Sequence, residues 1–204
     1  QMLQARAGAS TGNNRRYVRR PWELSRHSIE ASRLQIAPRL RWVPYIMGAA
    51  GKRWIEPLDY CVLWDRDALE LKNDIENNFG EGSIRWKLSG LERYFFLGVA
   101  FASLGQRFSA RAHRYSSVID NMGLSVFPED VASATCSMNT QWAHEILTGL
   151  NPGLHFQAGD VRRLPWRIID SSAEVFASVE AAFATHEERR ETSIEFRRPG
   201  PSPW

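Results

Sequence analysis

Short apolar runs that alternate with polar residues occupy the middle of the chain, and this pattern is typical of strands. The strand candidates are residues 40–45, 60–64, 83–88, 108–115 and 124–127. Pro44 lacks a ladder donor, so the first of these strands is predicted to lie at a sheet edge. The apolar stretch 94–104 fits a strand or a helix by its periodicity, and the two remain open.

Apolar residues spaced three and four apart predict helices elsewhere in the chain. The helix candidates are residues 22–36, 67–79, a segment opened by 128–130, 139–149 and 171–191. Pro38 closes the first of them, and Gly149 with Pro152 ends the helix at 139–149. The apolar stripe of the last helix consists of Val175, Phe176, Val179, Ala182 and Phe183.

Glycine and asparagine positions predict the turns between these elements. Residues 8–14 are predicted to form a loop with exposed backbone amides, and 48–51 and 159–160 are predicted to be turns. Residues 155–157 are predicted to add a short strand. The whole pattern predicts an α+β fold with a mixed, mostly antiparallel central sheet and helices at the C-terminal end.

Charge is distributed unevenly along the 204 residues, although the formal net charge is only +3. Residues 1–60 hold ten Arg and one Lys against four acids, which is 11 − 4 = +7, and residues 61–92 lean acidic. A basic segment of this kind suggests a polyanionic partner. Arg outnumbers Lys by 23 to 3, which suits phosphate and guanine recognition, although a GC-rich genome raises the same ratio.

Other features of the composition bound the class of protein. No run approaches the ~18 apolar residues of a membrane span, and the N-terminus has no apolar signal segment. Cys61 and Cys136 have neither metal-ligand nor disulfide spacing, so a cytoplasmic protein with free thiols is expected. The chain begins at Gln1, and we expect it to be a piece of a longer protein.

Four segments occur in an order that points to one protein family. They are residues 10–19, 41–45 with 51–54, 150–165 and 191–196, and 123–128 also fits. This order resembles large bacterial adenine-specific DNA methyltransferases of phage-defence and restriction–modification systems. These include BREX methylases (PglX-like) and restriction–methylases with a fused specificity domain. Asn13 and Ala49 stand where the family has acidic or glycine residues, and the helical region 129–149 is shorter than in the family.

The resemblance implies a target-recognition domain over residues 1–166, with a C-terminal helix and tail over 167–204 packed on it. The implied partners are duplex DNA, an upstream methyltransferase domain of the same longer chain, and other subunits of the defence system. S-adenosylmethionine is the implied cofactor of the longer enzyme.

The methyl-transfer motifs of that family are missing from this sequence. Family members hold the flipped adenine with an Asn/Asp-Pro-Pro-Tyr/Phe motif, whereas Asn151-Pro152 is followed here by Gly153 and Leu154. The two glycines of residues 8–12 follow no strand, so they do not form the S-adenosylmethionine loop. We therefore expect no catalytic, cofactor-binding or metal-binding residue in this chain.

Ten residues are the candidate DNA contacts: Thr11, Asn14, Arg15, Arg16, Arg19, Lys52, Arg53, Arg85, Lys87 and Arg111. They lie in the polar loop, after a glycine turn, or on strand faces, where cations and amides reach phosphates and base edges. A solvated loop, a surface hairpin and ordinary strand faces remain the alternatives. The tryptophans at 22, 42, 64, 86 and 142 are expected in the core rather than as stacking platforms.

Two functional hypotheses remain, and a third, an independent small enzyme, is disfavoured because the sequence has no matched acid, base, nucleophile or metal set. The first is a sequence-specific duplex DNA recognition module of an N6-adenine methyltransferase. The alternative is a protein-interaction or scaffold domain that docks partner subunits of the same system. A positive surface joining residues 11–20, 52–53 and 85–87 favours DNA, and an exposed apolar face on the last helix favours a protein. Asp59, Glu70 and Lys72 mimic the order of a nuclease site, a pattern that arises often by chance.

Overall fold

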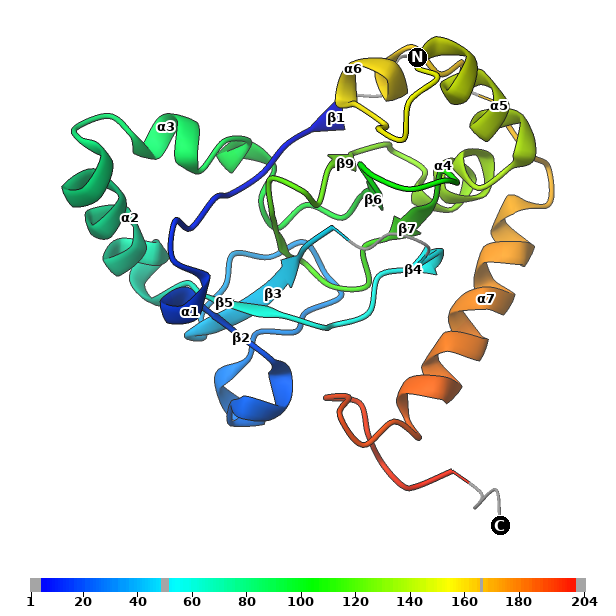
Figure 1. Ribbon diagram of the computed structural model, residues 1–204. Coiled ribbons are helices and arrows are strands. Elements are labelled where there is room, and N and C mark those ends of the chain that lie inside the picture. The colour runs from blue at the N-terminus through cyan, green and yellow to red at the C-terminus, as the bar shows by residue number, and fades with distance from the viewer. Residues whose placement is uncertain (1–4, 49–51, 166, 201–204) are drawn as a thin grey trace.

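The computed structural model describes residues 5–48, 52–165 and 167–200. Within these ranges, short strands form two sheets with helices on both sides (Figure 1). Most strand pairings are antiparallel, and two are parallel, β3 with β8 and β4 with β7. The predicted α+β class is confirmed, and the predicted central sheet is divided into two.

The larger sheet has five strands in the order β1-β9-β6-β7-β4. Their bounds are β1 (Ala5–Arg6), β9 (Ser125–Val126), β6 (Val99–Phe101), β7 (Ala110–Ala112) and β4 (Trp54–Ile55). Every residue of β6, β7 and β9 is buried, so both faces of this sheet are covered.

The smaller sheet has four strands in the order β2-β5-β3-β8. Their bounds are β2 (Val18–Arg19), β5 (Cys61–Leu63), β3 (Trp42–Ile46) and β8 (Val118–Ile119). The predicted edge position of the strand at 40–45 is wrong, because β3 lies between β5 and β8. Pro44 is tolerated there because β8 pairs with β3 only at Tyr45 and Ile46, which leaves Pro44 with one neighbouring strand.

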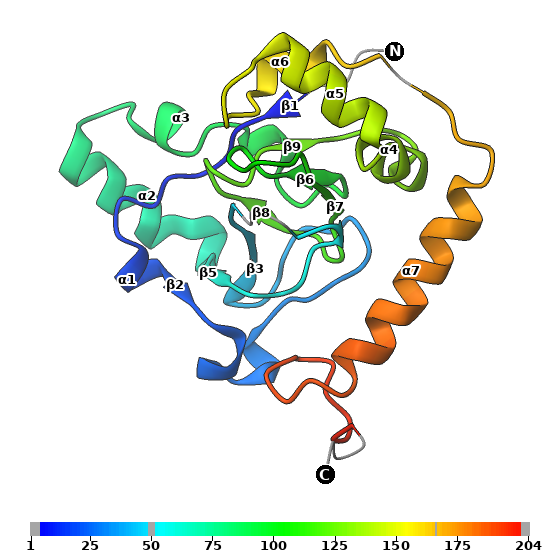
Figure 2. The same ribbon diagram turned by 45° about the vertical axis from the view of Figure 1, so that its right-hand side comes forward.

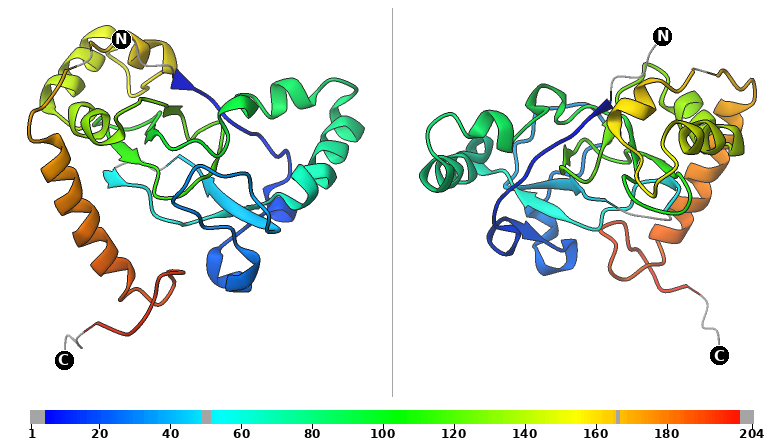
Figure 3. Two further views of the ribbon diagram at one scale, coloured as in Figure 1. Left: turned by 180° about the vertical axis from the view of Figure 1, so that it is seen from behind. Right: turned by 45° about the horizontal axis from the view of Figure 1, so that its top comes forward.

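The helices flank the strands in two groups, with α1 to α3 on one side and α4 to α7 on the other (Figures 2 and 3). The α-helices are α1 (Asn14–Tyr17), α2 (Asp65–Phe79), α3 (Ile84–Lys87), α4 (Val131–Met138), α5 (Gln141–Leu150), α6 (Ala158–Arg162) and α7 (Ser172–Glu187). Short 3₁₀ turns are η1 (Pro21–Glu23), η2 (Arg26–Ser28) and η3 (Leu91–Arg93). Among the described residues, no helix is both long and apolar enough to cross a membrane.

Capping side chains begin two of the helices where the sequence predicts. The Asp130 carboxylate accepts a hydrogen bond from the Ser133 N–H at 2.9 Å, and the Thr140 hydroxyl accepts one from the Ala143 N–H at 3.1 Å. Each cap typically contributes about 1 kcal/mol. The helices after 128–130 and at 139–149 are confirmed, as are the central parts of the elements predicted at 60–64, 67–79, 108–115, 124–127 and 171–191.

Two predicted elements are wrong. Residues 22–36 contain the turns η1 and η2 instead of a helix, because only Leu24, Ile29 and Ala31 reach the core there and they form no helical stripe. Residues 83–88 contain the one-turn helix α3 instead of a strand. Ile84 and Leu88, four residues apart, lie on one side of a helical turn as well as on one face of a strand, so the alternation fits both.

Smaller differences concern the connections. Residues 155–157 contribute one isolated bridge, Leu104 with His155, rather than a strand. The predicted turn at 159–160 lies inside α6, and the undecided stretch 94–104 contains the strand β6. The predicted turn at 48–51 falls mostly outside the described residues.

Each sheet has a hydrophobic core of its own. The smaller sheet packs against α2 through buried side chains such as Val43, Val62, Leu71 and Ile75. The larger sheet packs against α4, α5 and α6, and its core includes Phe101, Phe108, Met138, Leu147 and Phe156. Fully burying a side chain of this size contributes about 2 kcal/mol, so these two clusters hold each sheet to the helices that cover it.

A buried ion pair lies at one end of the larger sheet. Arg111 of β7 has no exposed surface, and its Nε donates to the carboxylate of Glu56, which directly follows β4. The Glu56 N–H also donates to the Ala112 carbonyl at 2.9 Å. Burial raises the pKa of Glu56, and the guanidinium of Arg111 opposes that shift. The pair therefore fastens β4 to β7.

We expect Arg111→Met to lower the free energy of unfolding by about 3–5 kcal/mol, because it leaves the Glu56 carboxylate buried and uncompensated. The double variant Arg111→Met/Glu56→Met should recover most of this loss, since both charges are then gone. Urea unfolding measures both effects, with Arg66→Met at an exposed side chain as the control. A single-variant loss below about 1 kcal/mol contradicts this role of the pair.

Candidate nucleic-acid interface

The polar N-terminal loop and α3 lie side by side. Ala9 forms an antiparallel bridge with Leu88, and the Ser10 N–H donates to the Lys87 carbonyl at 2.6 Å. Two groups of candidate DNA contacts, at 11–19 and 85–87, thus lie on one part of the surface. The sequence gives no sign of this contact between the loop and α3, because the two segments are about 70 residues apart and 83–88 is predicted to be a strand.

The loop itself is ordered by its own polar side chains. Thr11 is buried, and its hydroxyl donates to the Asn14 Oδ1 at 2.5 Å. The Asn13 Oδ1 accepts from the Arg16 N–H at 3.2 Å and caps α1. Thr11 therefore shapes the loop from within, and Asn14 remains at the surface.

The three arginines of this region differ in what they contact. Arg16 is paired with two acids of α2, since its guanidinium lies 2.7 Å from Glu70 and 2.8 Å from Asp74. The hydrogen bond with Glu70 raises the pKa of Arg16. Arg19 donates to the backbone carbonyls of Arg15 and Val18. Arg15 is exposed, so of the three it is the most accessible to a phosphate.

α3 presents two cations and an aromatic ring to solvent. Arg85 and Trp86 are exposed, and Trp86 retains 59% of its accessible surface. The Lys87 ammonium lies 3.7 Å from the ring centroid of Phe79, at the end of α2, and 5.0 Å from that of Trp86. Phe79 and Trp86 are in edge-to-face contact with their centroids 5.9 Å apart. We call Phe79, Trp86 and Lys87 the aromatic cluster.

The expectation that the tryptophans lie in the core is wrong for two of them. Trp64 is buried, and Trp42 and Trp142 are half-buried, whereas Trp22 and Trp86 are 53% and 59% exposed. Trp86 lies between Arg85 and Lys87 in the sequence, which is also the pattern of an inward side chain on an amphipathic strand. The sequence alone does not distinguish an exposed Trp86 from a buried one, and only the helical turn at α3 shows that the side chain is exposed.

The candidates at 52–53 lie elsewhere on the molecule. They directly precede β4, which is on the α7 side and across the strands from α3 (Figure 1). Lys52 is ion-paired with Asp59. Burial, and then the neighbouring guanidinium of Arg107, lower the pKa of Arg53. The positive surface that would join all three candidate groups is therefore divided into two parts.

Arg111 does not belong to any surface group. Its side chain is fully buried beside Glu56, so it holds the sheet together instead of facing a ligand. Its predicted place on a strand is correct, but a charge on a strand covered on both faces must find its partner inside the protein. Arg111 is accordingly left out of the DNA-contacting set that we propose below.

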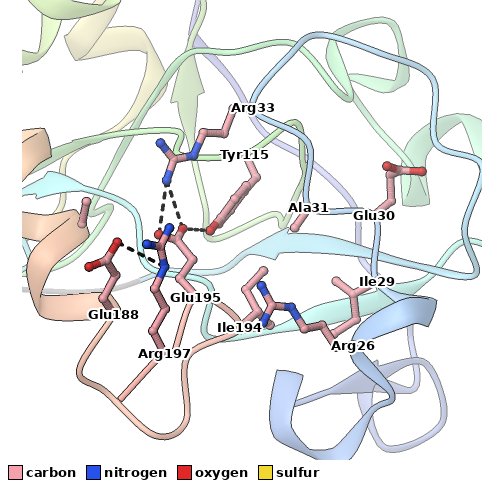
Figure 4. A pocket seen from close by; sticks show the side chains of 11 residues that line it. Arg26, Ile29, Glu30, Ala31, Arg33, Tyr115, Glu188, Ile194, Glu195 and Arg197 are labelled. Carbon is pink, nitrogen blue, oxygen red and sulfur yellow. Dashed lines mark hydrogen bonds and ion pairs between the residues drawn. The ribbon is translucent and has the colours of Figure 1, made fainter. Parts of the chain in front are cut away.

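A cleft of about 630 Å³ lies between residues 26–33 and the C-terminal segment 184–197 (Figure 4). Glu195 is its central group and accepts hydrogen bonds from Arg114 at 2.5 and 2.7 Å, from Arg33 at 3.2 Å and from the Tyr115 hydroxyl. Burial acts to raise the pKa of Glu195, but these contacts outweigh it and lower the pKa to about 2. The central charges of this cleft neutralise one another and anchor the C-terminal segment.

The nuclease-like order of Asp59, Glu70 and Lys72 is not assembled in space. Asp59 pairs with Lys52, Glu70 with Arg16, and Lys72 with Asp67. In the described part of the chain, no three His, Cys, Asp or Glu side chains come together as metal ligands. Both cysteines are buried, and burial raises the pKa of Cys61 to about 12.

Comparison with curated proteins finds a distant relative. No family model matches the chain. A curated adenine-specific methyltransferase is 26% identical over 170 residues, which are 80% of this chain. That protein is PglX of Lacticaseibacillus casei (strain Zhang). The chain spans only 14% of the length of PglX.

The pairing of Glu195 makes stability depend on pH. Its folded-state pKa of about 2 lies below the ordinary value of about 4.3. The contribution of the ionised Glu195 carboxylate to the free energy of unfolding is therefore complete above a pH of about 4.3. It is lost as the pH falls through about 2. We expect the wild type to lose up to about 3 kcal/mol more unfolding free energy than Glu195→Gln between pH 6 and pH 2.

Urea unfolding at a series of pH values measures this difference. Glu191→Gln, at an exposed carboxylate in the same segment, serves as the control and should keep the wild-type pH profile. Identical profiles for Glu195→Gln and the wild type would show that the carboxylate is not held as described.

Proposed function

We propose that this chain is the DNA-recognition module of an N6-adenine DNA methyltransferase in a restriction–modification or phage-defence system. In this proposal, residues 1–166 form the recognition domain, and 167–204 pack on it. The longer protein supplies the catalytic domain and binds S-adenosylmethionine. The observation that carries the proposal is the similarity to the adenine-specific methyltransferase PglX over 80% of this chain.

The arrangement of surface cations supports a DNA contact. Arg15, Arg85 and Lys87 are brought to one region by the backbone contacts between the loop and α3. Arg53 and Arg107 form a second pair of neighbouring guanidiniums near β4, where a phosphate would relieve their mutual repulsion. Phosphate contacts of this kind position a protein on the duplex, and base-edge contacts then select the sequence.

The acidic face of α2 limits where the backbone of DNA can pass. Arg16 pairs with both Glu70 and Asp74, which leaves one net negative charge, and Lys72 pairs with Asp67. A phosphate approaching α2 would have to compete with these pairs. The proposed contact therefore centres on Arg15 and α3 and does not run along α2.

A protein-interaction role is the second candidate, and one feature of α7 favours it. Only Ser172 and Glu187 of this helix are buried. Val175 retains 40% of its accessible surface, and Phe176, Val179 and Phe183 are only half-buried. Incompletely covered apolar side chains along one helix are typical of a docking face. Both roles can coexist, because α7 and α3 lie on opposite sides of the strands (Figure 1).

DNA binding is expected to weaken steeply with salt, because bound phosphates release counterions. Arg85→Gln should reduce the slope of log K against log salt concentration by about one, as expected for one lost phosphate contact. Fluorescence anisotropy with a labelled duplex measures both slopes.

Arg197→Gln is the matched control for that titration. Its side chain is 76% exposed, and it lies in the C-terminal segment, away from α3 (Figure 1). Its slope should equal that of the wild type. A wild-type chain that binds no duplex at low salt would contradict the recognition role and leave the docking role.

A further inference from the structure

Phe79 and Trp86 of the aromatic cluster are unusually exposed for large aromatic side chains. They retain 46% and 59% of their accessible surface and lie in direct contact. Lys87 covers part of them, with its ammonium 3.7 Å from the Phe79 centroid. An exposed aromatic surface next to a cation is the combination that binds nucleobases, since the ring stacks on the base and the cation attracts the phosphate chain.

The aromatic cluster is held in place from beneath. Gly80 and Gly82 adopt positive φ angles of 89° and 78°, which let the chain turn sharply between α2 and α3. The buried Ser83 hydroxyl donates to the Ile75 carbonyl at 3.2 Å. Leu88 is buried in the core directly after α3. The rings therefore project from an anchored turn, which reduces the entropy lost when a ligand binds.

Hydrogen-bonding groups lie next to the Phe79 ring. Phe79 lines a cavity of about 370 Å³ together with Thr11, Gly12, Asn13, Asp74 and Asn78. Amide side chains such as Asn13 and Asn78 can pair with the edges of a base. The loop approaches the ring closely, since a Cβ placed on Gly12 would lie 3.1 Å from Phe79. These edge-reading groups thus adjoin Phe79, which is in turn in contact with Trp86.

We propose that the aromatic cluster is a stacking site for a nucleobase displaced from the duplex, with Trp86 as the stacking ring. The inference rests on the proposed DNA-recognition function and adds a specific ligand to it. A base inside a duplex is covered on both faces by its neighbours, so only an unpaired or extruded base offers a free face to Trp86.

Two labelled duplexes of one sequence test the proposal, one fully paired and one with a single unpaired adenine. Anisotropy titrations at one salt concentration give both affinities. The wild type is expected to bind the unpaired duplex about tenfold more tightly, in line with one base–aromatic stack. Trp86→Ala should abolish this preference, so that the variant binds the two duplexes with equal affinity. Trp86→Phe should retain part of the preference.

Trp22→Ala is the matched control. Trp22 is 53% exposed and lies 5.5 Å from the guanidinium of Arg20, so its chemistry resembles that of Trp86 at another place on the molecule. It should keep the full preference for the unpaired duplex. An equal loss in Trp22→Ala would overturn the assignment to Trp86.

The outcomes separate this inference from the function on which it rests. Equal wild-type affinity for both duplexes overturns the stacking site and leaves DNA recognition intact. A preference for the unpaired duplex that survives in Trp86→Ala also overturns the stacking site and leaves DNA recognition intact. A wild-type chain that binds neither duplex contradicts the recognition function itself. Far-UV circular dichroism on each variant confirms that the exposed substitutions leave the fold unchanged.

Discussion

The buried pair of Arg111 and Glu56 is the interaction on which the rest of the architecture depends. Both charges are buried, so the free-energy cost of removing each from water is offset mainly by its contact with the other. The pair joins β7 to β4, and α7 packs against β4 as well as α4. The C-terminal helix therefore packs on a strand that is held to β7 by both the backbone pairing and this ion pair.

The same principle explains why several arginines of this chain lie outside the proposed DNA contact. Arg111 and Arg114 neutralise Glu56 and Glu195, and Arg16 is paired with two acids of α2. The guanidinium of Arg162 donates to the Ala5 carbonyl and fastens α6 to β1. The arginines that hold the fold together are therefore not available to contact the bases or phosphates of DNA. The exposed cations at α1 and α3 remain, and they carry the proposed contact.

Much of the fold could be predicted from the sequence, because apolar runs and capping residues act locally. Residues 128–130 and the pattern at 139–149 predict two helices, and Asp130 and Thr140 cap them in the structure. Residues 83–88 show the limit of such reasoning, since a period-two pattern over one turn fits a strand and a helix alike. Partners distant in sequence have no local signal, so the pairing of Arg111 with Glu56 could not be predicted from either residue's neighbours. The exposure of Trp86 could not be predicted for the same reason, because it depends on how α3 packs against distant parts of the chain.

The surface proposed for DNA and the one proposed for a protein lie on opposite sides of the strands, which makes them separable in one experiment (Figure 1). Amide hydrogen exchange of the chain with and without duplex DNA measures where backbone protection increases. The account predicts increased protection at residues 10–19 and 84–88, and no change over α7. Protection confined to α7, or absent from both α1 and α3, would contradict it.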